Sequence, residues 1–243
     1  MYITSYVKEH GIQEGLAKFF AQKRMPYEVL TLLPDAPADC PWHALRDMTL
    51  TEAIAGVFAP LADQFSGTVA QLQEHSRALA CVHAAGVWYL LYVVRPYADD
   101  ILWIGREPAD SPPLPEAAQT AGWTLPEPLA NFYRIHNGFG VSDVSGGAGF
   151  DARLWNAVCI RPAHRLELLA WETEGEDGVA YEPSDMLFFF HDGGGDYEGF
   201  LPKEASDDPW EVAYYNHEED YVEDSLAGDF FETMDEWFEE QFA

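Results

Sequence analysis

The sequence predicts an α+β fold in which an antiparallel sheet packs against flanking helices. Short apolar runs rich in β-branched and aromatic residues are bounded by turn residues, a pattern typical of strands. Apolar residues also recur at helical spacing near both ends of the chain. The short sequences Ala84-Ala85-Gly86 and Tyr97-Ala98-Asp99-Asp100 separate consecutive strand-like runs, which favours turns between neighbouring strands.

The first half of the chain is predicted to combine helices with three strands. Apolar residues at helical spacing predict a helix over residues 8–25, and they are Ile12, Leu16, Phe19 and Phe20. A Thr-Glu-Ala sequence at Thr51 indicates a second helix that continues to about residue 61 and resumes over residues 69–79. Strands are expected at residues 79–83, 87–94 and 101–105.

A proline-rich segment, residues 107–113, follows the third strand. Clustered proline disfavours both a helix and a strand ladder, so this segment is expected to be a linker. The sequence therefore predicts a domain boundary here. It separates an N-terminal α+β region of unknown role, residues 1–110, from a second domain at residues 114–243.

The second domain is predicted to begin with a capped helix. Thr124 and Glu127 match a capping box, and the helix that follows is expected to end at Asn137-Gly138. Its predicted buried face consists of Leu125, Leu129, Phe132 and Tyr133. The elements expected next are a glycine-rich loop at 138–149, a strand at 157–160, a helical stretch at 162–171, and strands at 186–190, 197–201 and 212–215.

A last helix is predicted over residues 230–242. Asp229 is expected to be its N-cap, with Glu232 completing a second capping box. The apolar stripe of this helix favours core packing over a ligand site, and it consists of Phe230, Phe231, Met234, Trp237, Phe238 and Phe242.

The formal net charge of −29 is concentrated in the C-terminal third. Residues 172–243 contain 24 acidic residues and one basic residue, whereas residues 1–171 contain 18 acidic and 12 basic residues. Such a charge repels nucleic acid and anionic membranes, and it raises the rate of encounter with cationic partners. Taken alone, the charge favours a role in solubility over a role in binding.

Three cysteines, Cys40, Cys81 and Cys159, are widely spaced. The odd number and the absence of a Cys-x-x-Cys pair argue against a disulfide scaffold and a zinc knuckle, and they fit a reducing compartment. The N-terminus lacks the apolar core of a secretory signal, and the apolar run at residues 78–94 reads as two strands and falls short of a typical membrane span. The protein is therefore expected in the cytoplasm.

The sequence Asp192-Gly193-Gly194-Gly195-Asp196 follows an apolar strand and could bind phosphate, bind calcium or turn the chain. A phosphate site disfavours flanking aspartates, and glycine at three successive positions leaves a calcium loop without oxygen ligands. Glycine and aspartate both accept the backbone conformations of a tight turn. A turn between antiparallel strands is therefore predicted, with both carboxylates projecting from its edge.

A metal-dependent hydrolase is the enzymatic alternative. It would use His191, Asp192, Asp196 and His217, together with Glu218 and Asp220, if the two segments meet in the fold. The spacing matches no established metal-binding motif, and an acidic chain contains such neighbours by chance. The sequence therefore assigns no catalytic residue, no metal ligand and no cofactor.

Three motifs over residues 114–243 together resemble those of a known family. The sequence Leu125-Pro126-Glu127-Pro128-Leu129-Ala130-Asn131-Phe132-Tyr133, followed by Asn137-Gly138, is similar to the opening signature of the SMI1/KNR4 (SUKH) superfamily. The turn from Asp192 through Gly193, Gly194 and Gly195 to Asp196 resembles its central motif. The sequence Leu226-Ala227-Gly228-Asp229-Phe230 resembles the start of its closing helix.

The resemblance implies an α+β domain that binds other proteins. Most bacterial members are thought to be immunity proteins that neutralise toxins, often nucleases or deaminases, and eukaryotic relatives act as regulatory scaffolds. We therefore expect a non-enzymatic immunity protein that binds a cationic toxin, with a regulatory scaffold as the alternative. The partner-binding candidates are acidic and aromatic residues of the C-terminal third, namely Asp207, Asp208, Trp210, Tyr214, Tyr215, Glu218, Glu219, Asp220, Tyr221, Glu223 and Asp224.

Overall fold

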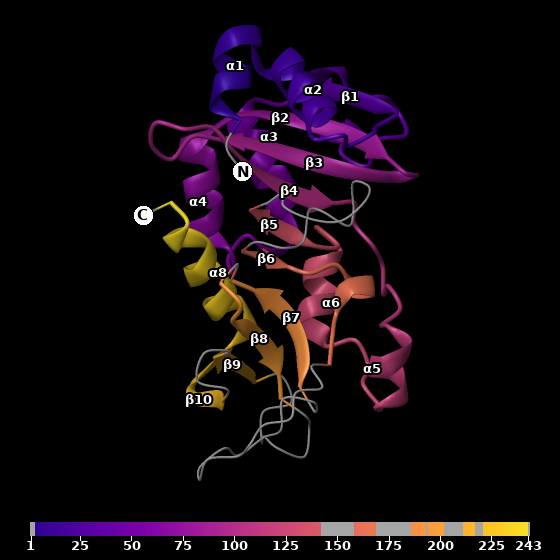
Figure 1. Ribbon diagram of the computed structural model, residues 1–243, viewed down its shortest axis with the longest axis vertical. Helices are drawn as coiled ribbons and strands as arrows, with labels where there is room; N and C mark the ends of the chain where they lie inside the picture. Colours follow the sequence, from indigo (N-terminus) through magenta and orange to yellow (C-terminus); the bar gives the residue numbers. More distant parts are fainter. Residues whose placement is uncertain are drawn as a thin grey trace.

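A single antiparallel sheet extends along the long axis of the molecule (Figure 1). The computed structural model describes residues 3–141, 158–168, 186–192, 194–201, 211–216 and 221–242. These residues contribute ten strands, and each strand pairs with the next one in the sequence. The strands are β1 (Val29–Leu32), β2 (Ser76–Ala84), β3 (Val87–Val94), β4 (Ile101–Arg106), β5 (Phe139–Val141), β6 (Cys159–Ile160), β7 (Leu187–His191), β8 (Tyr197–Phe200), β9 (Val212–Asn216) and β10 (Tyr221–Gly228).

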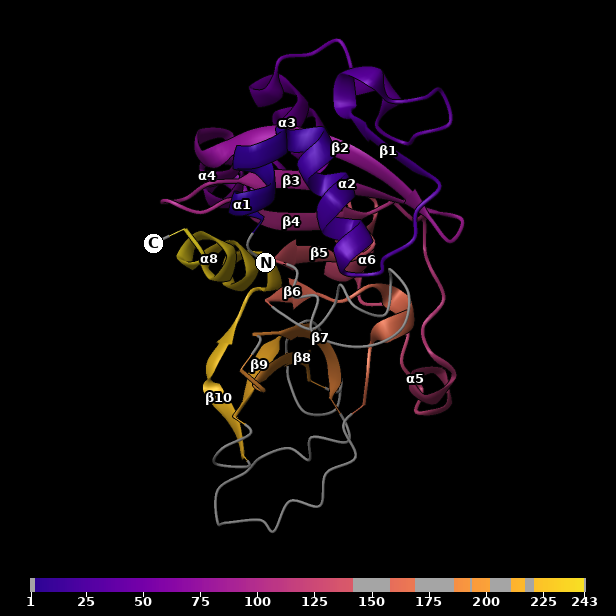
Figure 2. The same cartoon turned by 45° about the horizontal axis from the view of Figure 1, so that its top comes forward.

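Helices pack on both faces of this sheet, which confirms the predicted α+β class (Figure 2). The α-helices are α1 (Thr4–His10), α2 (Ile12–Gln22), α3 (Leu50–Phe58), α4 (Ser66–His75), α5 (Glu116–Thr120), α6 (Glu127–Tyr133) and α8 (Phe230–Glu240). Single 3-10 turns are η1 (Leu33–Asp35), η2 (His43–Leu45), η3 (Ala59–Leu61) and η4 (Ala163–Arg165). None of the helices in the described part of the chain is long and apolar enough to cross a membrane.

Alternation along the strands divides the core between the two faces of the sheet. In β2, Ala80 and Val82 face α1 and α2, while Leu79 and Cys81 face the larger core that contains α3, α4, α6 and α8. Successive strand residues point to opposite faces, so one strand can supply both cores. This explains why β2 and β3 read as nearly continuous apolar runs.

The sheet passes from the first 110 residues into the rest of the chain without interruption. β4 pairs with β5 through Ile104 and Gly140. The larger core likewise combines side chains from α3 and α4 with side chains from α6 and α8. Whether residues 1–110 and 114–243 act as separate domains stays a prediction, although their strands share one sheet.

The predicted hairpin between β2 and β3 is present. Ala84 pairs with Val87, and the two turn residues between them, Ala85 and Gly86, have φ angles of 53° and 77°. Two central residues with positive φ make a tight turn whose twist matches that of the flanking strands. The strand predicted at residues 87–94 is β3.

The helix predicted over residues 8–25 is two helices. Gly11 has a φ of 76° and separates α1 from α2, and the four apolar residues that suggested the helix all lie in α2. The second predicted helix is α3, which begins at Leu50, one residue before the predicted start at about Thr51. Thr49 is its N-cap: its side chain accepts a hydrogen bond from the Glu52 amide, and Glu52 accepts one from the Thr49 amide, which makes a capping box.

The predicted capping box at Thr124 is wrong. α6 begins after Pro126, and no side chain caps it. Proline restricts the residue before it to extended backbone, so the helix cannot start at Leu125. The helix also ends earlier than expected, with Arg134 as its C-cap.

The helix predicted over residues 162–171 is wrong for its described part. Only the single turn η4 forms, and Glu167 then exchanges two backbone hydrogen bonds with Phe188 in β7. Pairing with a neighbouring strand therefore replaces the helical hydrogen bonds that the local sequence favoured. Residues 169–171 of this predicted helix lie outside the described residues. The strand predicted at residues 157–160 corresponds to β6, and residue 157 also lies outside the described residues.

Three further elements, β1, α5 and β10, have no counterpart in the prediction, and β5 occupies the start of the predicted glycine-rich loop. Gly140 in β5 has a φ of 154°, and a Cβ there would overlap the backbone at Val158 and Cys159 in the neighbouring strand. Glycine therefore allows β5 and β6 to approach closely. The remaining loop residues, 142–149, lie outside the described residues.

The last helix, α8, matches its prediction closely. Asp229 accepts hydrogen bonds from the amides of Phe231 and Glu232, so its half of the predicted capping box is present. The apolar stripe packs into the larger core, where Phe230, Met234 and Phe238 are buried. The interpretation of this stripe as core is therefore confirmed for Phe230, Met234, Phe238 and Phe242, whereas Phe231 and Trp237 are only partly buried.

Candidate functional site

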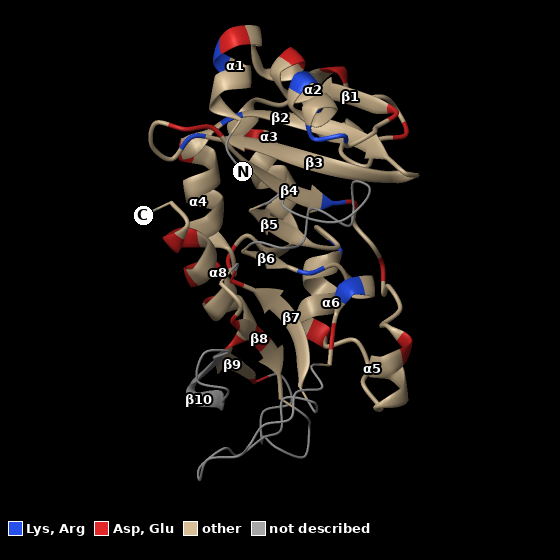
Figure 3. Ribbon diagram, viewed as in Figure 1, with Lys and Arg blue, Asp and Glu red and all other residues tan. Residues whose placement is uncertain are grey.

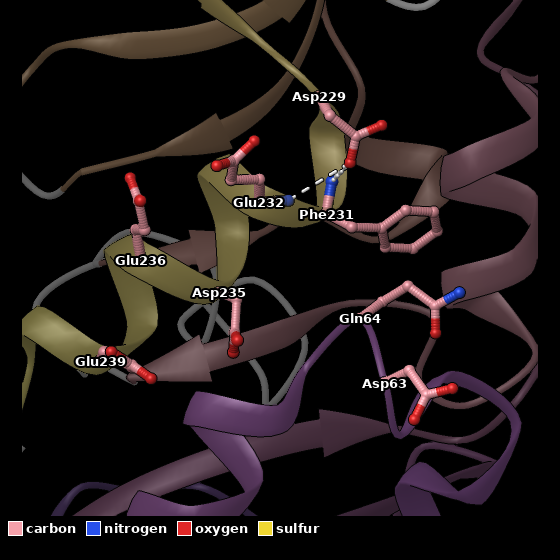
Figure 4. A pocket seen from close by; sticks show the side chains of 8 residues that line it. All are labelled: Asp63, Gln64, Asp229, Phe231, Glu232, Asp235, Glu236 and Glu239. Carbon is pink, nitrogen blue, oxygen red and sulfur yellow. Dashed lines mark hydrogen bonds between the residues drawn. The ribbon is translucent and has the colours of Figure 1, made fainter.

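A pocket of about 380 Å³ opens between α8 and the turn that precedes α4 (Figure 4). Phe231, Gln64 and Asp63 lie on one side of it, and the carboxylates of α8 lie on the other. Six of the eight lining residues are acidic, and the lining consists of Asp63, Gln64, Asp229, Phe231, Glu232, Asp235, Glu236 and Glu239. We call this set the acidic pocket.

Spacing along α8 brings its carboxylates to the pocket. Glu232, Glu236 and Glu239 are separated by four and three residues, which places them on one side of a helix. α8 contains no Lys or Arg, and Figure 3 shows acidic residues at several points along it. The apolar stripe of the same helix faces the core, so the carboxylates are held at the surface.

Two carboxylates of the pocket are used to hold the structure together. Asp229 caps its own helix. Asp235 caps α4 from a distance in the sequence, because its Oδ1 accepts bonds from the Thr68 amide at 2.7 Å and the Thr68 hydroxyl at 2.6 Å. Its Oδ2 accepts a third bond from the Gly67 amide at 3.0 Å. Asp235 therefore joins α8 to the positive end of α4.

Four carboxylates of the pocket have no cationic partner among the described residues. Asp63, Glu232, Glu236 and Glu239 are exposed, and no ion pair in the described part of the chain involves them. The ring of Phe231 is half-buried between them and the core, edge-on to Phe65 at 5.9 Å. An uncompensated acidic rim beside an aromatic ring can receive a cationic side chain.

The acidic glycine turn is the predicted connection between two antiparallel strands, since β7 pairs with β8 on either side of it. Its carboxylates do not both project from the edge as expected. Asp192 Oδ1 accepts bonds from the amides of Gly194, Gly195 and Asp196 at 2.7, 3.0 and 3.1 Å. The Asp192 carboxylate thus holds the turn itself, because an aspartate can satisfy backbone amides a few residues onward.

The second carboxylate of this turn is also engaged. Asp196 accepts a hydrogen bond from the hydroxyl of Tyr214 in β9. Burial raises the pKa of Tyr214, and the nearby Asp196 carboxylate raises it further. The turn is therefore fastened to β9, and Gly193 lies outside the described residues.

Glu198 is a buried carboxyl between β8 and α8. It is 4% exposed, and its Oε1 accepts a hydrogen bond of 3.0 Å from the Trp237 indole N–H. Burial raises the pKa of Glu198 to about 8, Asp192 adds to this, and the Trp237 bond opposes it. The carboxyl is therefore protonated at neutral pH, as expected for an acid that is removed from water without a cation beside it.

The opening-motif residues hold the core together. Tyr133 is fully buried, and its hydroxyl donates a hydrogen bond of 2.7 Å to the Arg161 carbonyl. The side-chain oxygen of Asn137 accepts a bond of 2.9 Å from the Ala163 amide. Both bonds attach α6 and the following turn to the segment after β6. The other motif residues also lie in or against this core, and they are Leu125, Pro126, Phe132 and Gly138.

His136, beside this motif, is packed in the core. It is fully buried, and burial lowers its pKa to about 3. Its Nε2 accepts from the Tyr92 hydroxyl at 2.9 Å, and its Nδ1 donates to the Arg106 carbonyl at 3.2 Å. Both ring nitrogens are thus satisfied by neutral partners, and the histidine is part of the packed core.

The residues proposed for a metal-dependent hydrolase are not brought together in the described part of the chain. No group of three or more His, Cys, Asp or Glu side chains among the described residues could hold a metal ion. His191 instead packs edge-on against Tyr197 at 4.8 Å. His217, Glu218 and Asp220 lie outside the described residues.

Most of the predicted partner-binding residues cannot be compared with the structure. Asp207, Asp208, Trp210, Glu218, Glu219 and Asp220 lie outside the described residues, and Tyr221, Glu223 and Asp224 are described only as backbone of β10. The prediction that Tyr215 is an exposed anchor is wrong, because its side chain is fully buried and its ring lies 6.1 Å from that of Phe188. Alternation in β9 turns Tyr215 into the core, so it is not an exposed anchor.

The acidic pocket was missed from the sequence, although part of its signal was present. Acidic residues at intervals of three and four on an amphipathic helix predict one charged face. The contribution of Asp63 and Gln64 had no such signal, because contact between α4 and α8 is a property of the tertiary structure.

A family model identifies the class of protein to which this fold and these motifs belong. The model described as SMI1 / KNR4 family (SUKH-1) matches residues 110–240. The chain therefore belongs to the SMI1/KNR4 family, and the predicted resemblance is confirmed. Neither the curated proteins nor the solved structures give a match to this chain.

Proposed function

We propose that this chain is a non-enzymatic immunity protein that binds a cationic bacterial toxin of the nuclease or deaminase type and occludes its active site. Membership of the SMI1/KNR4 family is consistent with an immunity or protein-binding module. Such a protein would act in the cytoplasm, beside the targets of the toxin. The observation that carries the proposal is the acidic pocket, in which four carboxylates have no cationic partner among the described residues.

The electrostatics of the pocket favour a basic partner. A nuclease or deaminase that acts on nucleic acid has a cationic active-site cleft, and a cluster of carboxylates can occupy it as a polyanionic substrate would. Attraction between opposite charges chiefly raises the association rate and the selectivity. The acidic residues at 207–208, 218–220 and 223–224 would extend this surface if they lie beside it.

Affinity also requires a packed centre. Phe231 is the described aromatic side chain at the acidic pocket, and it is fixed from behind by Phe65 and Phe230. A rigid aromatic ring ringed by charge is a suitable anchor for an arginine side chain of the toxin. Loss of this ring should therefore raise the dissociation rate, whereas loss of the carboxylates should lower the association rate.

Capture on the immobilised full chain from the native lysate, washed at low and then high salt, would provide the partner. The captured protein is then expressed alone and together with this chain. The proposal requires that the partner inhibits growth when alone and that coexpression restores growth. A partner that is harmless when expressed alone would instead support the regulatory scaffold.

Charge reversal tests whether the acidic pocket makes the contact. Glu232→Lys/Glu236→Lys should lower the association rate about tenfold or more at low salt and flatten its salt dependence. Glu9→Lys/Glu74→Lys is the matched control, because it changes the net charge equally at exposed positions of α1 and α4 away from the pocket lining. Equal association rates for the two variants would reject the pocket as the contact. Asp220→Lys/Glu223→Lys applies the same test to the acidic segment outside it.

A further inference from the structure

The sheet of described strands ends in two outer strands, β1 and β10. An outer strand has backbone N–H and C=O groups that no neighbouring strand pairs, and another chain can use them. On β1, the Leu30 carbonyl accepts a hydrogen bond of 3.3 Å from the Gln13 side chain of α2, so α2 contacts this strand. None of the described strands pairs with the outer side of β10, and Figure 2 shows β10 at the margin of the sheet. The outer side of β10 is therefore an edge to which a further strand can add.

Hydrogen bonding between β8 and β9 gives the direction of the backbone groups in β9. The Leu201 amide donates to the Glu211 carbonyl at 3.1 Å, so Glu211 directs its backbone groups toward β8. From there to Tyr215, β8 and β9 pair without a register shift. Because the backbone groups of successive strand residues point to opposite sides, Tyr214 and Asn216 direct theirs toward β10.

The same rule gives the direction of the backbone groups in β10. Tyr221 lies opposite Asn216, and Glu223 lies opposite Tyr214, so these are the hydrogen-bonded pairs between β10 and β9. Val222 lies between them in the strand, and its N–H and C=O therefore point away from β9. The outer edge thus has a donor and an acceptor on one residue, which is the arrangement that an added antiparallel strand requires.

β10 leads into the acidic pocket. The strand ends at Gly228, and Asp229 and Phe231, which both line the pocket, follow within three positions. β10 also contains Glu223 and Asp224 but no Lys or Arg. A second copy of this chain, with a formal net charge of −29, would be repelled from this edge, whereas a basic segment would be attracted. The charge therefore favours a cationic partner strand.

We propose that β10 is a docking edge on which the toxin adds an extended segment containing Lys or Arg as a further strand of the sheet. This proposal rests on the function proposed above, and it specifies how the partner is held. Main-chain hydrogen bonds to β10 supply affinity, and the acidic pocket at the end of the strand receives a basic side chain of the same segment. Loss of the main-chain pairing should therefore appear chiefly in the dissociation rate.

A proline on the outer edge tests this pairing. Val222→Pro removes the outward N–H and leaves the pairing of Tyr221 and Glu223 with β9, because an outer strand accepts proline where its nitrogen faces solvent. Val222→Ala is the matched control, since it shortens the same side chain and keeps the N–H. Against the toxin identified by capture and growth rescue, Val222→Pro should raise the dissociation rate about tenfold or more, and Val222→Ala less than about threefold.

Hydrogen exchange provides a second measurement that needs no variant. In the complex of the full chain with the toxin, the Val222 amide should exchange at least about tenfold more slowly than in the free chain, because it becomes hydrogen-bonded. The amides of β1 should exchange at the same rate in both states, since β1 lies at the other end of the sheet. This measurement decides the question if thermal denaturation shows that Val222→Pro is unfolded.

The results that would overturn the docking edge differ from those that would overturn the proposed function. A toxin that is captured and neutralised, but that leaves the Val222 amide unprotected or binds both variants equally, would leave immunity intact and remove β10 as the contact. Protection of the Val222 amide that rises with the concentration of the free chain would assign the edge to a second copy. If no toxic protein is retained, the proposed function fails and the docking edge fails with it.

Discussion

Replacement of Asp235 by alanine tests how the C-terminal helix is held to the first half of the chain. The Asp235 carboxylate receives three hydrogen bonds from the first turn of α4, at 2.6, 2.7 and 3.0 Å. Thr68, which makes two of them, is fully buried. Asp235→Ala therefore removes the acceptor of the buried Thr68 hydroxyl.

The size of the effect follows from these contacts. Removal of an N-cap acceptor costs about 1 kcal/mol. Leaving a buried hydroxyl unpaired costs a further 1–3 kcal/mol, roughly. We expect Asp235→Ala to lower the free energy of unfolding by about 2–4 kcal/mol, which corresponds to a fall in Tm of roughly 5–15 °C for a chain of this size.

Urea denaturation followed by circular dichroism measures the loss, with Glu236→Ala as the matched control. Glu236 is exposed on the same helix and makes no hydrogen bond or ion pair in the described residues, so its replacement should change stability by less than about 0.5 kcal/mol. Thr68→Val in a double-mutant cycle should show coupling to Asp235 of at least about 1 kcal/mol. A loss below about 0.5 kcal/mol for Asp235→Ala, or additive effects in the cycle, would refute the capping argument.

Two further predictions concern buried carboxyl groups. The folded-state pKa of Glu198 is about 8, above its usual value of 4.5, so the folded state keeps a proton that the unfolded chain has lost. The free energy of unfolding should therefore fall as pH rises between these values, by at most about 1.4 kcal/mol per pH unit. Glu198→Gln should flatten this dependence when denaturation is measured at several pH values. An unchanged slope would contradict the raised pKa of Glu198. Asp100 is fully buried and receives bonds from Arg77 at 3.0 Å and Arg95 at 2.6 Å. Asp100→Ala should lower the free energy of unfolding by about 3 kcal/mol, because it leaves two arginines without their buried partner. As a control, Glu14→Ala breaks the exposed pair with Lys18 and should lower it by less than about 0.5 kcal/mol. Similar losses for the two variants in thermal denaturation would show that burial of Asp100 is unimportant.

Elements with strong local signals were predicted well. β3 and the β2–β3 turn followed from an apolar run and a turn sequence, and α8 followed from Asp229 and a wide apolar stripe. Each of these depends on residues near one another in the sequence. The motifs of the SMI1/KNR4 family were recognised for the same reason.

Elements that depend on distant partners were predicted poorly. Residues after η4 favour a helix locally, yet Glu167 pairs with Phe188, because a strand edge was available there. β5 was predicted to be the start of a loop, because glycine in a sequence usually indicates a loop. Gly140 lies in a strand because β6 packs so closely against it that a Cβ would overlap the β6 backbone. Tyr215 was expected at the surface, because the direction of a strand residue is set by register with its neighbours.

The sequence by itself determined the α+β class, the family, the acidity of the C-terminal third and the turn at Asp192, since these depend on composition and short motifs. Only the tertiary structure decided that strands from both halves join one sheet, that Asp235 caps α4 and that an acidic pocket opens beside Phe231. These features arise from contacts between residues far apart in the chain, and local spacing cannot specify which distant surfaces pack together.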